Sequence, residues 1–265
     1  IVRCLVERPG VNVNQARTDD GATPLYIAAY KGHTEIVRCL VERPGVDVNQ
    51  ARMAYTSFLF APRNLRDTNG NTGMTPLYAA ANQGHTEIVQ CLVERPGVNV
   101  NQSRTDTGET PLYAAANQGH AEIVRCLVER PGVDVNEATT DTGMTPLCIA
   151  AGQGHAEIVR CLVERPGVDV NQARRIYGMT PLYMAANQGH TEIVRCLVER
   201  PGVNVNQART DTGETPLYAA ANQGHTEIVR CLVERPGVNV NQARTDNGET
   251  PLYASAFKGH TEIVR

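Results

Sequence analysis

The sequence predicts an all-α repeat solenoid, elongated and curved, and a fixed spacing supports this prediction. The tripeptide Thr-Pro-Leu recurs along the chain, beginning at Thr23, Thr75, Thr110, Thr145, Thr180, Thr215 and Thr250. From Thr75 onward each step is 35 residues, whereas the first step is 52 residues, which leaves 17 extra residues. A repeat at this spacing is typical of stacked units that bury their faces only against their neighbours.

Each unit is expected to begin with a short helix, as the stretch from Thr110 shows. Thr110 offers an N-cap hydroxyl, and Pro111 follows at the first helical position, where its missing N–H costs nothing. Leu112 starts the apolar face, and Gly119 stands where a left-handed residue ends a helix. A helix of about eight residues is not stable alone, so stacking must hold it.

A second helix is expected from about residue 122 to 129. Its apolar residues form a broad face, and Glu122, Arg125 and Glu129 fall on the opposite side. We interpret this charged stripe as a solvated outer surface with weak ion pairs. The Arg-Pro-Gly sequence at 130–132 then stops the helix.

A polar, hairpin-like loop is expected to complete the unit. Val133 to Asn136 alternates as an extended segment does, and the stretch to Gly143 is turn-like. Asn136 is expected to hydrogen-bond the backbone of the turn that follows it.

This pattern resembles the ankyrin repeat family. Residues 110–115 read Thr-Pro-Leu-Tyr-Ala-Ala where the family has T-P-L-H-x-A, and Gly119-His120 and Val135-Asn136 match its Gly-His turn and its Val-Asn before the hairpin. The unit is longer than the family's usual length of about 33 residues. The family's histidine after Thr-Pro-Leu is tyrosine in six units and Cys148 in one; a tyrosine hydroxyl can still hydrogen-bond between units.

The resemblance covers essentially the whole chain and predicts one ankyrin-repeat array over residues 1–265. It begins with a partial repeat at 1–22, continues with repeats that start near 23, 75, 110, 145, 180, 215 and 250, and ends in a truncated repeat. An insertion falls within 53–72 and replaces a hairpin tip. The chain reads as an interior segment of a longer protein.

Composition excludes several function classes. The formal net charge of -3 and a pI of about 6.2 provide no basic field for nucleic acid. No apolar stretch is long enough to insert into a membrane. Seven of the eight cysteines occupy one repeat position, too far apart for disulfides, so we expect reduced, buried side chains and a cytoplasmic location.

Catalysis and cofactor binding are not expected. Each of the seven histidines follows a helix-ending glycine and is interpreted as a turn residue bonded to backbone, because the His–Cys spacing does not fit zinc and no Cys-x-x-Cys occurs. No serine lies in a Gly-x-Ser-x-Gly context, and no phosphate loop is present. Near-identical units also lack the unique constellation that a catalytic site needs.

Partner binding is expected where the chain departs from its own repeat, because the family binds partners at hairpin tips and on the inner face of the first helices. The candidates are, in the insertion, Tyr55, Phe58, Leu59 and Phe60; on one tip, Arg174, Arg175, Ile176 and Tyr177; and on the inner face, Tyr30 and Phe257. The alternatives are that the insertion folds back onto its own solenoid, and that the other changes are neutral variation on an exposed face.

Two functions remain open from the sequence. The first is a non-enzymatic protein-interaction scaffold whose partner is chosen by these exceptional residues. The second is a structural rod, or a filament that self-assembles head to tail, because near-identical units suit a regular stack and neither end carries a polar cap.

Overall fold

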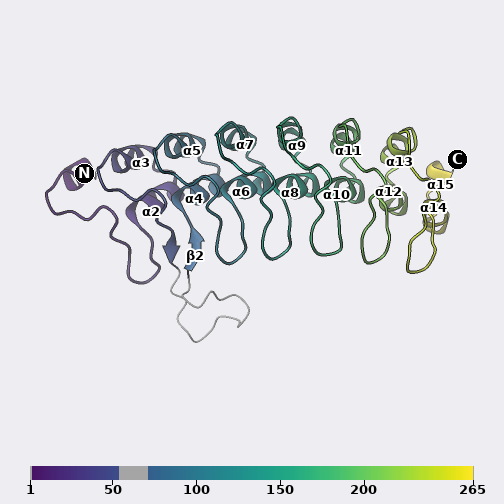
Figure 1. Ribbon diagram of the computed structural model, residues 1–265, viewed down its shortest axis with the longest axis horizontal. Coiled ribbons are helices and arrows are strands. Elements are labelled where there is room, and N and C mark those ends of the chain that lie inside the picture. Colours follow the sequence, from purple (N-terminus) through teal and green to yellow (C-terminus); the bar gives the residue numbers. More distant parts are fainter. Residues whose placement is uncertain (1, 54–70, 265) are drawn as a thin grey trace. The chain divides into compact units, whose positions relative to one another are not determined.

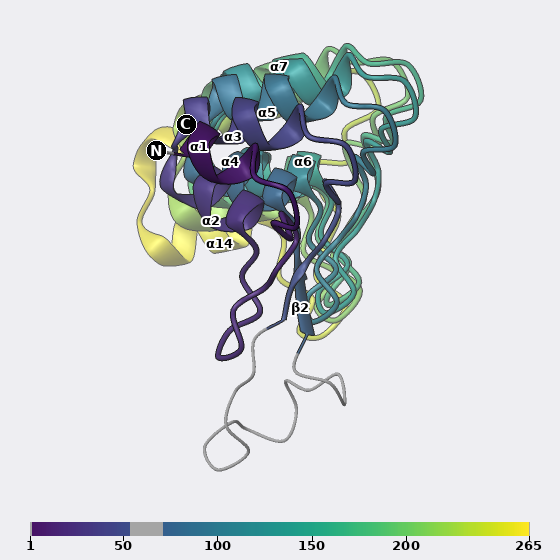
Figure 2. The same ribbon diagram turned by 90° about the vertical axis from the view of Figure 1, so that its left-hand side faces the viewer.

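The computed structural model describes residues 2–53 and 71–264. It contains two compact units, Ile1–Asp141 and Thr142–Arg265. Each unit is a row of helix pairs, with inner helices in one layer, outer helices in a second layer, and loops that project from the row (Figure 1). In the first unit the outer helices lie above the inner helices, and the hairpin loops extend away below (Figure 2).

The helices of the first unit are α1 (Val2–Val6), α2 (Pro24–Lys31), α3 (Thr34–Val41), α4 (Pro76–Gln83), α5 (Thr86–Val93), α6 (Pro111–Gln118) and α7 (Ala121–Val128). The even-numbered helices are the inner ones. Those of the second unit are α8 (Pro146–Gln153), α9 (Ala156–Val163), α10 (Pro181–Gln188), α11 (Thr191–Val198), α12 (Pro216–Gln223), α13 (Thr226–Val233), α14 (Pro251–Lys258) and α15 (Thr261–Val264).

The inner helices begin and end as the sequence predicts. The Tyr113 N–H donates to the Thr110 hydroxyl at 3.1 Å, and Pro111 occupies the first turn. Gly119 closes the helix in the left-handed region at φ 82°, and its N–H donates to Ala115 O. These caps satisfy backbone groups that a short helix otherwise leaves open.

Stacking of neighbouring helix pairs forms the core within each unit. Within a unit each inner helix contacts the next, as α4 contacts α6 and α10 contacts α12. Ala80 and Ala115 on these inner helices are fully buried, and their small side chains let the helices approach closely. Leu92 and Leu127 bury the outer helices against them, and each fully buried leucine contributes roughly 1.5–3 kcal/mol relative to an exposed one.

The Gly-His turn connects one repeat to the next within a unit. His120 Nε2 lies 3.3 Å from Asn82 O in the preceding repeat. The imidazole also fills the space beside Gly84, where a Cβ atom would lie only 2.7 Å from His120 Cε1. The prediction that the turn histidine bonds to backbone is therefore confirmed, and the structure adds that the partner belongs to the neighbouring repeat.

The asparagine at the end of the Val-x-Val-Asn segment also bridges repeats, as Asn101 and Asn206 show, a contact that the sequence did not predict. Asn101 Nδ2 donates to Gly132 O at 2.6 Å, and Asp134 N donates to Asn101 Oδ1 at 3.0 Å. The same pair of bonds joins Asn206 to the turn after α13. These asparagines therefore hold the Arg-Pro-Gly turn of the next repeat, not the turn that immediately follows them.

The repeated cysteines are free but are not buried, so that part of the prediction is wrong. Cys4 is exposed, and the other members of the row are partly exposed: Cys39, Cys91, Cys126, Cys161, Cys196 and Cys231. The stack of outer helices therefore leaves part of each of these side chains exposed. The buried cysteine is Cys148, which occupies the tyrosine position of an inner helix.

A pair of short strands flanks the insertion. The strands β1 (Arg52–Met53) and β2 (Asn71–Met74) are antiparallel, with Arg52 opposite Met74 and Met53 opposite Asn71. The four insertion candidates, Tyr55, Phe58, Leu59 and Phe60, lie outside the described residues. The expectation of one continuous array over residues 1–265 stays a prediction.

Replacement of the bridging asparagine should lower stability. Asn101→Ala removes two hydrogen bonds between repeats, and we expect a loss of roughly 1–2 kcal/mol in the free energy of unfolding, measured by urea denaturation. Asn241→Ala is the matched control. Asn241 stands at the same repeat position, but its exposed side chain makes no hydrogen bond to the described residues. Equal losses in the two variants would contradict the bridging role.

Candidate functional site

The hairpin tips form a row joined by one backbone hydrogen bond per step within each unit. Thr210 N donates to Tyr177 O, and Thr245 N donates to Thr212 O, both at 2.9 Å. The tips approach so closely that a Cβ atom on Gly213, at φ 73°, would lie 2.7 Å from Thr245 N. The tips are thus a surface on which side chains of neighbouring repeats meet.

One polar cluster recurs on these tips, and we call it the arginine network. It consists of an arginine, an aspartate two residues later, a glutamate five residues later, and the tyrosine 26 residues earlier. In the network of Arg209, Nε donates to Asp211 Oδ1 at 2.9 Å and Nη2 donates to Asp211 Oδ2 at 2.6 Å. Arg209 Nη1 reaches the Tyr183 hydroxyl at 3.5 Å and Glu214 at 3.4 Å.

The tyrosine joins the tip to the inner helix of the preceding repeat. The Tyr183 hydroxyl donates to Glu214 at 2.7 Å, and the guanidinium of Arg209 lies over the tyrosine ring, 5.8 Å from its centroid. Burial raises the pKa of Tyr183 to about 12, even though Arg209 opposes this shift. The hydrogen bonds from Arg209 hold the pKa of Asp211 below its usual range.

Complete networks also surround Arg104 and Arg244. Arg104 Nε donates to Asp106 at 2.9 Å, and Tyr78 donates to Glu109 at 2.6 Å. Arg244 Nε donates to Asp246 at 2.9 Å. Arg244 Nη1 also lies 3.2 Å from Glu214 of the preceding tip, so one network contacts the next. The predicted hydrogen bonding of the tyrosine between repeats is confirmed.

The tip at 174–179 keeps the arginine but replaces all three of its partners. Ile176 stands at the aspartate position, Met179 at the glutamate position, and Cys148 at the tyrosine position. The backbone still closes in the same way, because Arg174 N donates to Met179 O at 2.8 Å, as Arg209 N donates to Glu214 O at 2.9 Å. Arg174 Nε is buried and has no hydrogen-bond partner among the described residues.

The structure places the other three candidates of this tip on the surface. Arg175 and Ile176 are exposed, and Tyr177 is 48% exposed. Tyr177 has φ 70°, and it is the sole described residue other than glycine with a positive φ. Its ring is partly covered by the Arg209 guanidinium, at 5.2 Å from the centroid. Tyr177 therefore also contributes to the contact between tips.

The two inner-face candidates belong to different units and each stacks on a tyrosine one turn earlier. Tyr30 is 39% exposed, with its ring 6.3 Å from that of Tyr26. Phe257 is 75% exposed, with its ring 6.2 Å from that of Tyr253. The structure thus shows three separate groups of candidates, and the residues of the insertion remain outside what it describes.

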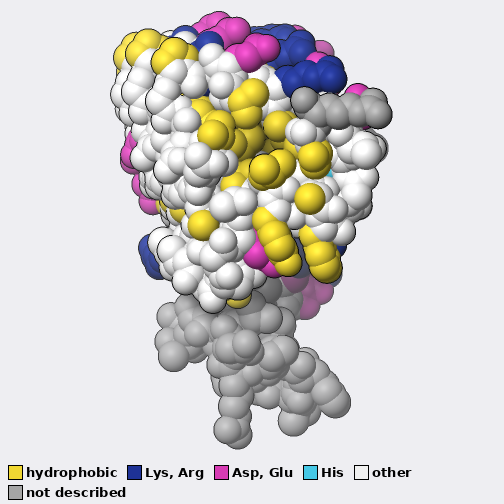
Figure 3. All heavy atoms as spheres, turned by 90° about the vertical axis from the view of Figure 1, so that its right-hand side faces the viewer, with side chains coloured by type: hydrophobic (Ala, Val, Ile, Leu, Met, Phe, Trp, Pro, Cys, Tyr) yellow, Lys and Arg dark blue, Asp and Glu magenta, His cyan; other side chains and the backbone are white. Residues whose placement is uncertain are grey.

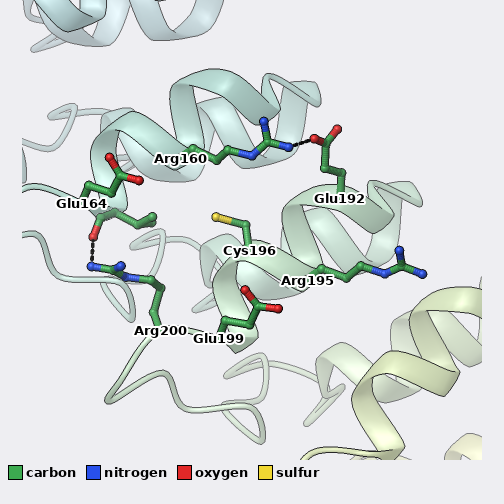
Figure 4. A pocket seen from close by; sticks show the side chains of 8 residues that line it. Arg160, Glu164, Glu192, Arg195, Cys196, Glu199 and Arg200 are labelled. Atoms are coloured by element: carbon green, nitrogen blue, oxygen red, sulfur yellow. Dashed lines mark hydrogen bonds and ion pairs between the residues drawn. The ribbon is translucent and has the colours of Figure 1, made fainter.

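A groove of about 520 Å³ lies between the outer helices α9 and α11. Its walls carry both signs of charge, with Arg160 paired to Glu192 and Arg200 donating to Val163 O, while Cys196 points into the groove (Figure 4). Burial raises the pKa of the Cys196 thiol despite the nearby Arg160. Balanced charges and a protonated thiol provide neither an anion site nor a nucleophile.

Metal and membrane sites do not arise from the described residues. No three His, Cys, Asp or Glu side chains within residues 2–53 and 71–264 are grouped as metal ligands would be. In the same part of the chain, each helix is too short and too polar to cross a membrane.

A family model for ankyrin repeats (3 copies) matches residues 1–52, 55–139, 132–209 and 201–265. The chain belongs to the ankyrin repeat family. Ankyrin repeat proteins generally mediate protein–protein interactions. Among curated proteins no match was found.

Solved ankyrin structures are similar to the chain over most of its length. The ankyrin repeat domain of Bcl-3, a member of the IκB family, has 26% identity and a TM-score of 0.71 over 93% of this chain and 99% of that chain. The ankyrin repeat protein EF0377 has 30% identity and a TM-score of 0.65 over 71% and 94%. The human ASB11 ankyrin repeat domain has 26% identity and a TM-score of 0.68 over 92% and 97%.

Sequence reasoning identified the 174–177 tip but missed the isolation of Arg174. The signal was present, because three substitutions at Cys148, Ile176 and Met179 remove the partners of one arginine. It could be recognised only after the structure had shown which residues surround each tip arginine. These are the residue 26 positions before the arginine and the residue five positions after it.

The burial of Tyr183, together with its hydrogen bond to Glu214, should make stability fall at high pH. Below about pH 10 both folded and unfolded chains keep the phenol protonated. Above that pH the unfolded chain loses the proton first, because the folded pKa is about 12, so this contribution disappears as the pH rises from 10 to 12. Tyr183→Phe should cost roughly 1 kcal/mol at neutral pH, and its difference from the wild type should shrink over that range.

The measurement is urea denaturation of both proteins at a series of pH values. Ala185→Gly, an uncharged change in the same helix, serves as the control, and its difference from the wild type should stay constant. A Tyr183→Phe difference that also stays constant would contradict the assignment.

Restoring the missing partners should stabilise the second unit. The triple variant Cys148→Tyr/Ile176→Asp/Met179→Glu rebuilds an arginine network around Arg174, and we expect a gain of roughly 1–2 kcal/mol, measured by thermal and urea denaturation. The reverse triple change in a complete network, Tyr183→Cys/Asp211→Ile/Glu214→Met, should destabilise the chain. A rebuilt variant less stable than the wild type would show that Arg174 does not lie where the other arginines do.

Proposed function

We propose that this chain is a non-enzymatic interaction scaffold, and that it selects a protein partner through the residues that depart from its repeat. One observation supports this proposal. The polar side chains of the motif are already engaged within the stack: the asparagine, histidine, tyrosine and tip arginine each contact a neighbouring repeat, as Asn101, His120, Tyr183 and Arg209 do. The side chains that remain available to a partner are therefore those at positions where the sequence departs from the repeat.

The exceptions carry the side chains that interfaces favour. Aromatic residues and arginine are frequent anchors of binding energy. Tyr177 and Arg174 lie together on one tip, and Tyr30 and Phe257 are exposed on inner helices. We include Tyr55, Phe58, Leu59 and Phe60 of the insertion on the sequence argument alone.

A second candidate function is head-to-tail self-association, because near-identical repeats can stack on one another in a regular row. Leu252 is 60% exposed, whereas Leu217 at the same position of the preceding repeat is 3% exposed. Tyr253, Phe257 and Val264 are also exposed, and Figure 3 shows a hydrophobic patch on the face at this end of the second unit. In the first unit, an apolar hollow of about 300 Å³ lies between α1, α2 and α3. Open-ended contacts of this kind propagate and do not close.

The two functions differ in the mass of the purified chain and in the variants that abolish binding. Light scattering across concentrations should show a constant monomer mass for a scaffold, and growth for a filament. Affinity purification from an extract of the source organism should then recover a protein with the wild type that is lost with Ile176→Ser/Tyr177→Asn or with Phe58→Ala/Phe60→Ala. Thr212→Ser, at the Tyr177 position of the next tip, is the matched control and should retain it.

The outcomes of these two measurements distinguish the scaffold from the filament. A monomer whose bound protein survives all variants contradicts recognition by the exceptional residues. Growth that is abolished by Leu252→Lys/Phe257→Glu supports the filament, and growth that persists in that variant shows lateral contacts in place of end stacking.

A further inference from the structure

Arg174 is a guanidinium without the carboxylates that its equivalents bind. In the three complete networks, Nε donates to an aspartate oxygen at 2.9 Å, for Arg104, Arg209 and Arg244 alike. At Arg174 this same nitrogen is buried without a partner. A buried unsatisfied group of this kind calls for an explanation. In the complete networks the acceptor of this nitrogen is a carboxylate oxygen, and the tip at 174–179 contains no carboxylate.

The rest of the Arg174 side chain is available from outside. The residue as a whole is half-buried, and its terminal nitrogens make no hydrogen bond within the described residues. In complete networks these nitrogens contact an aspartate, a glutamate and a tyrosine hydroxyl, but here those positions hold Ile176, Met179 and Cys148. Cys148 cannot substitute for tyrosine, because it is fully buried and its sulfur bonds to Gln172 O at 3.2 Å.

The sequence around Arg174 supplies no acid and adds apolar surface. No acidic residue occurs between Asp169 and Glu192. On the next tip, Asp211 is already held by two bonds from Arg209. Ile176 is 38% exposed at the position of the lost aspartate. A ligand for this tip must therefore bring its own negative charge beside an apolar group.

We propose that the tip at 174–179 binds an Asp or Glu side chain of a protein partner, with the carboxylate paired to the terminal nitrogens of Arg174 and an adjacent apolar residue packed on Ile176. The partner carboxylate replaces the one that each complete network supplies internally. Carboxylates pair with guanidinium groups through short, charge-assisted hydrogen bonds. The left-handed Tyr177 holds its ring against Arg209, which keeps the apolar side of the tip in place. This inference rests on the proposed scaffold function and specifies its partner chemistry.

A displayed library of short random peptides, selected on the immobilised full chain, tests the proposal. The wild type should enrich peptides with Asp or Glu next to an apolar residue, and a synthetic peptide of that kind should bind at least about tenfold more weakly when the acid is changed to its amide. Arg174→Gln should weaken binding of the same peptide by a similar factor.

Two further variants separate binding from folding. Ile176→Asp supplies an internal carboxylate to Arg174, so it should weaken peptide binding while leaving the chain at least as stable as the wild type in urea. Arg244→Gln removes the same charge from a complete network, and peptide affinity should stay within about twofold of the wild type. Loss of binding in Ile176→Asp cannot be assigned to unfolding.

Several results would contradict the proposed binding of a carboxylate by Arg174. Enriched peptides without acids, no enrichment at all, or equal binding by Arg174→Gln would overturn the carboxylate assignment. Binding only of peptides that carry phosphoserine in place of the acid would assign the tip to phosphate and overturn it as well. Enriched peptides whose binding is lost on mutation of Tyr30 or Phe257, and not of Arg174, would overturn the carboxylate assignment. They would still support the scaffold function.

Discussion

Contact between neighbouring helix pairs is the constraint on which the rest of this structure depends. Helices of eight residues are too short to persist in water, so each pair needs apolar surface from the next one. Alanine on the inner helices brings the backbones close, and the absence of a side chain at Gly84 makes room for His120. The free energy of folding within each unit is therefore a sum of similar contributions from contacts between adjacent repeats.

The polar residues of the motif contribute to the same contact. Asn101 satisfies the turn of the next repeat, and Tyr183 joins an inner helix to the following tip through Glu214. Because these groups are paired inside the stack, most of the repeating surface offers few unsatisfied groups to a ligand. Recognition of a particular partner must then depend on the positions where the repeat is broken.

The tip around Arg174 is such a position, and its departure is coordinated. One changed residue would leave a partial network, but Cys148, Ile176 and Met179 remove every partner of a single arginine while the backbone of the tip is retained. A charge held near an apolar surface without a counter-ion is unfavourable. A partner that supplies the carboxylate relieves this cost, so the same feature that weakens the stack favours binding.

The sequence by itself determined the repeat length, the helix boundaries and the glycine turns, because these depend on interactions within a few residues. The Thr110 cap bonds to a backbone group three residues away, and Gly119 adopts its conformation without help from other repeats. The exceptional tip at 174–177 was also visible as a break in the pattern. The tertiary structure alone decided which groups meet across repeats: the asparagine bridges to a turn 31 residues ahead, and the cysteine row is only partly covered. It also showed that Arg174 is isolated, since a partner 26 residues away along the chain becomes a neighbour only once the repeats are stacked.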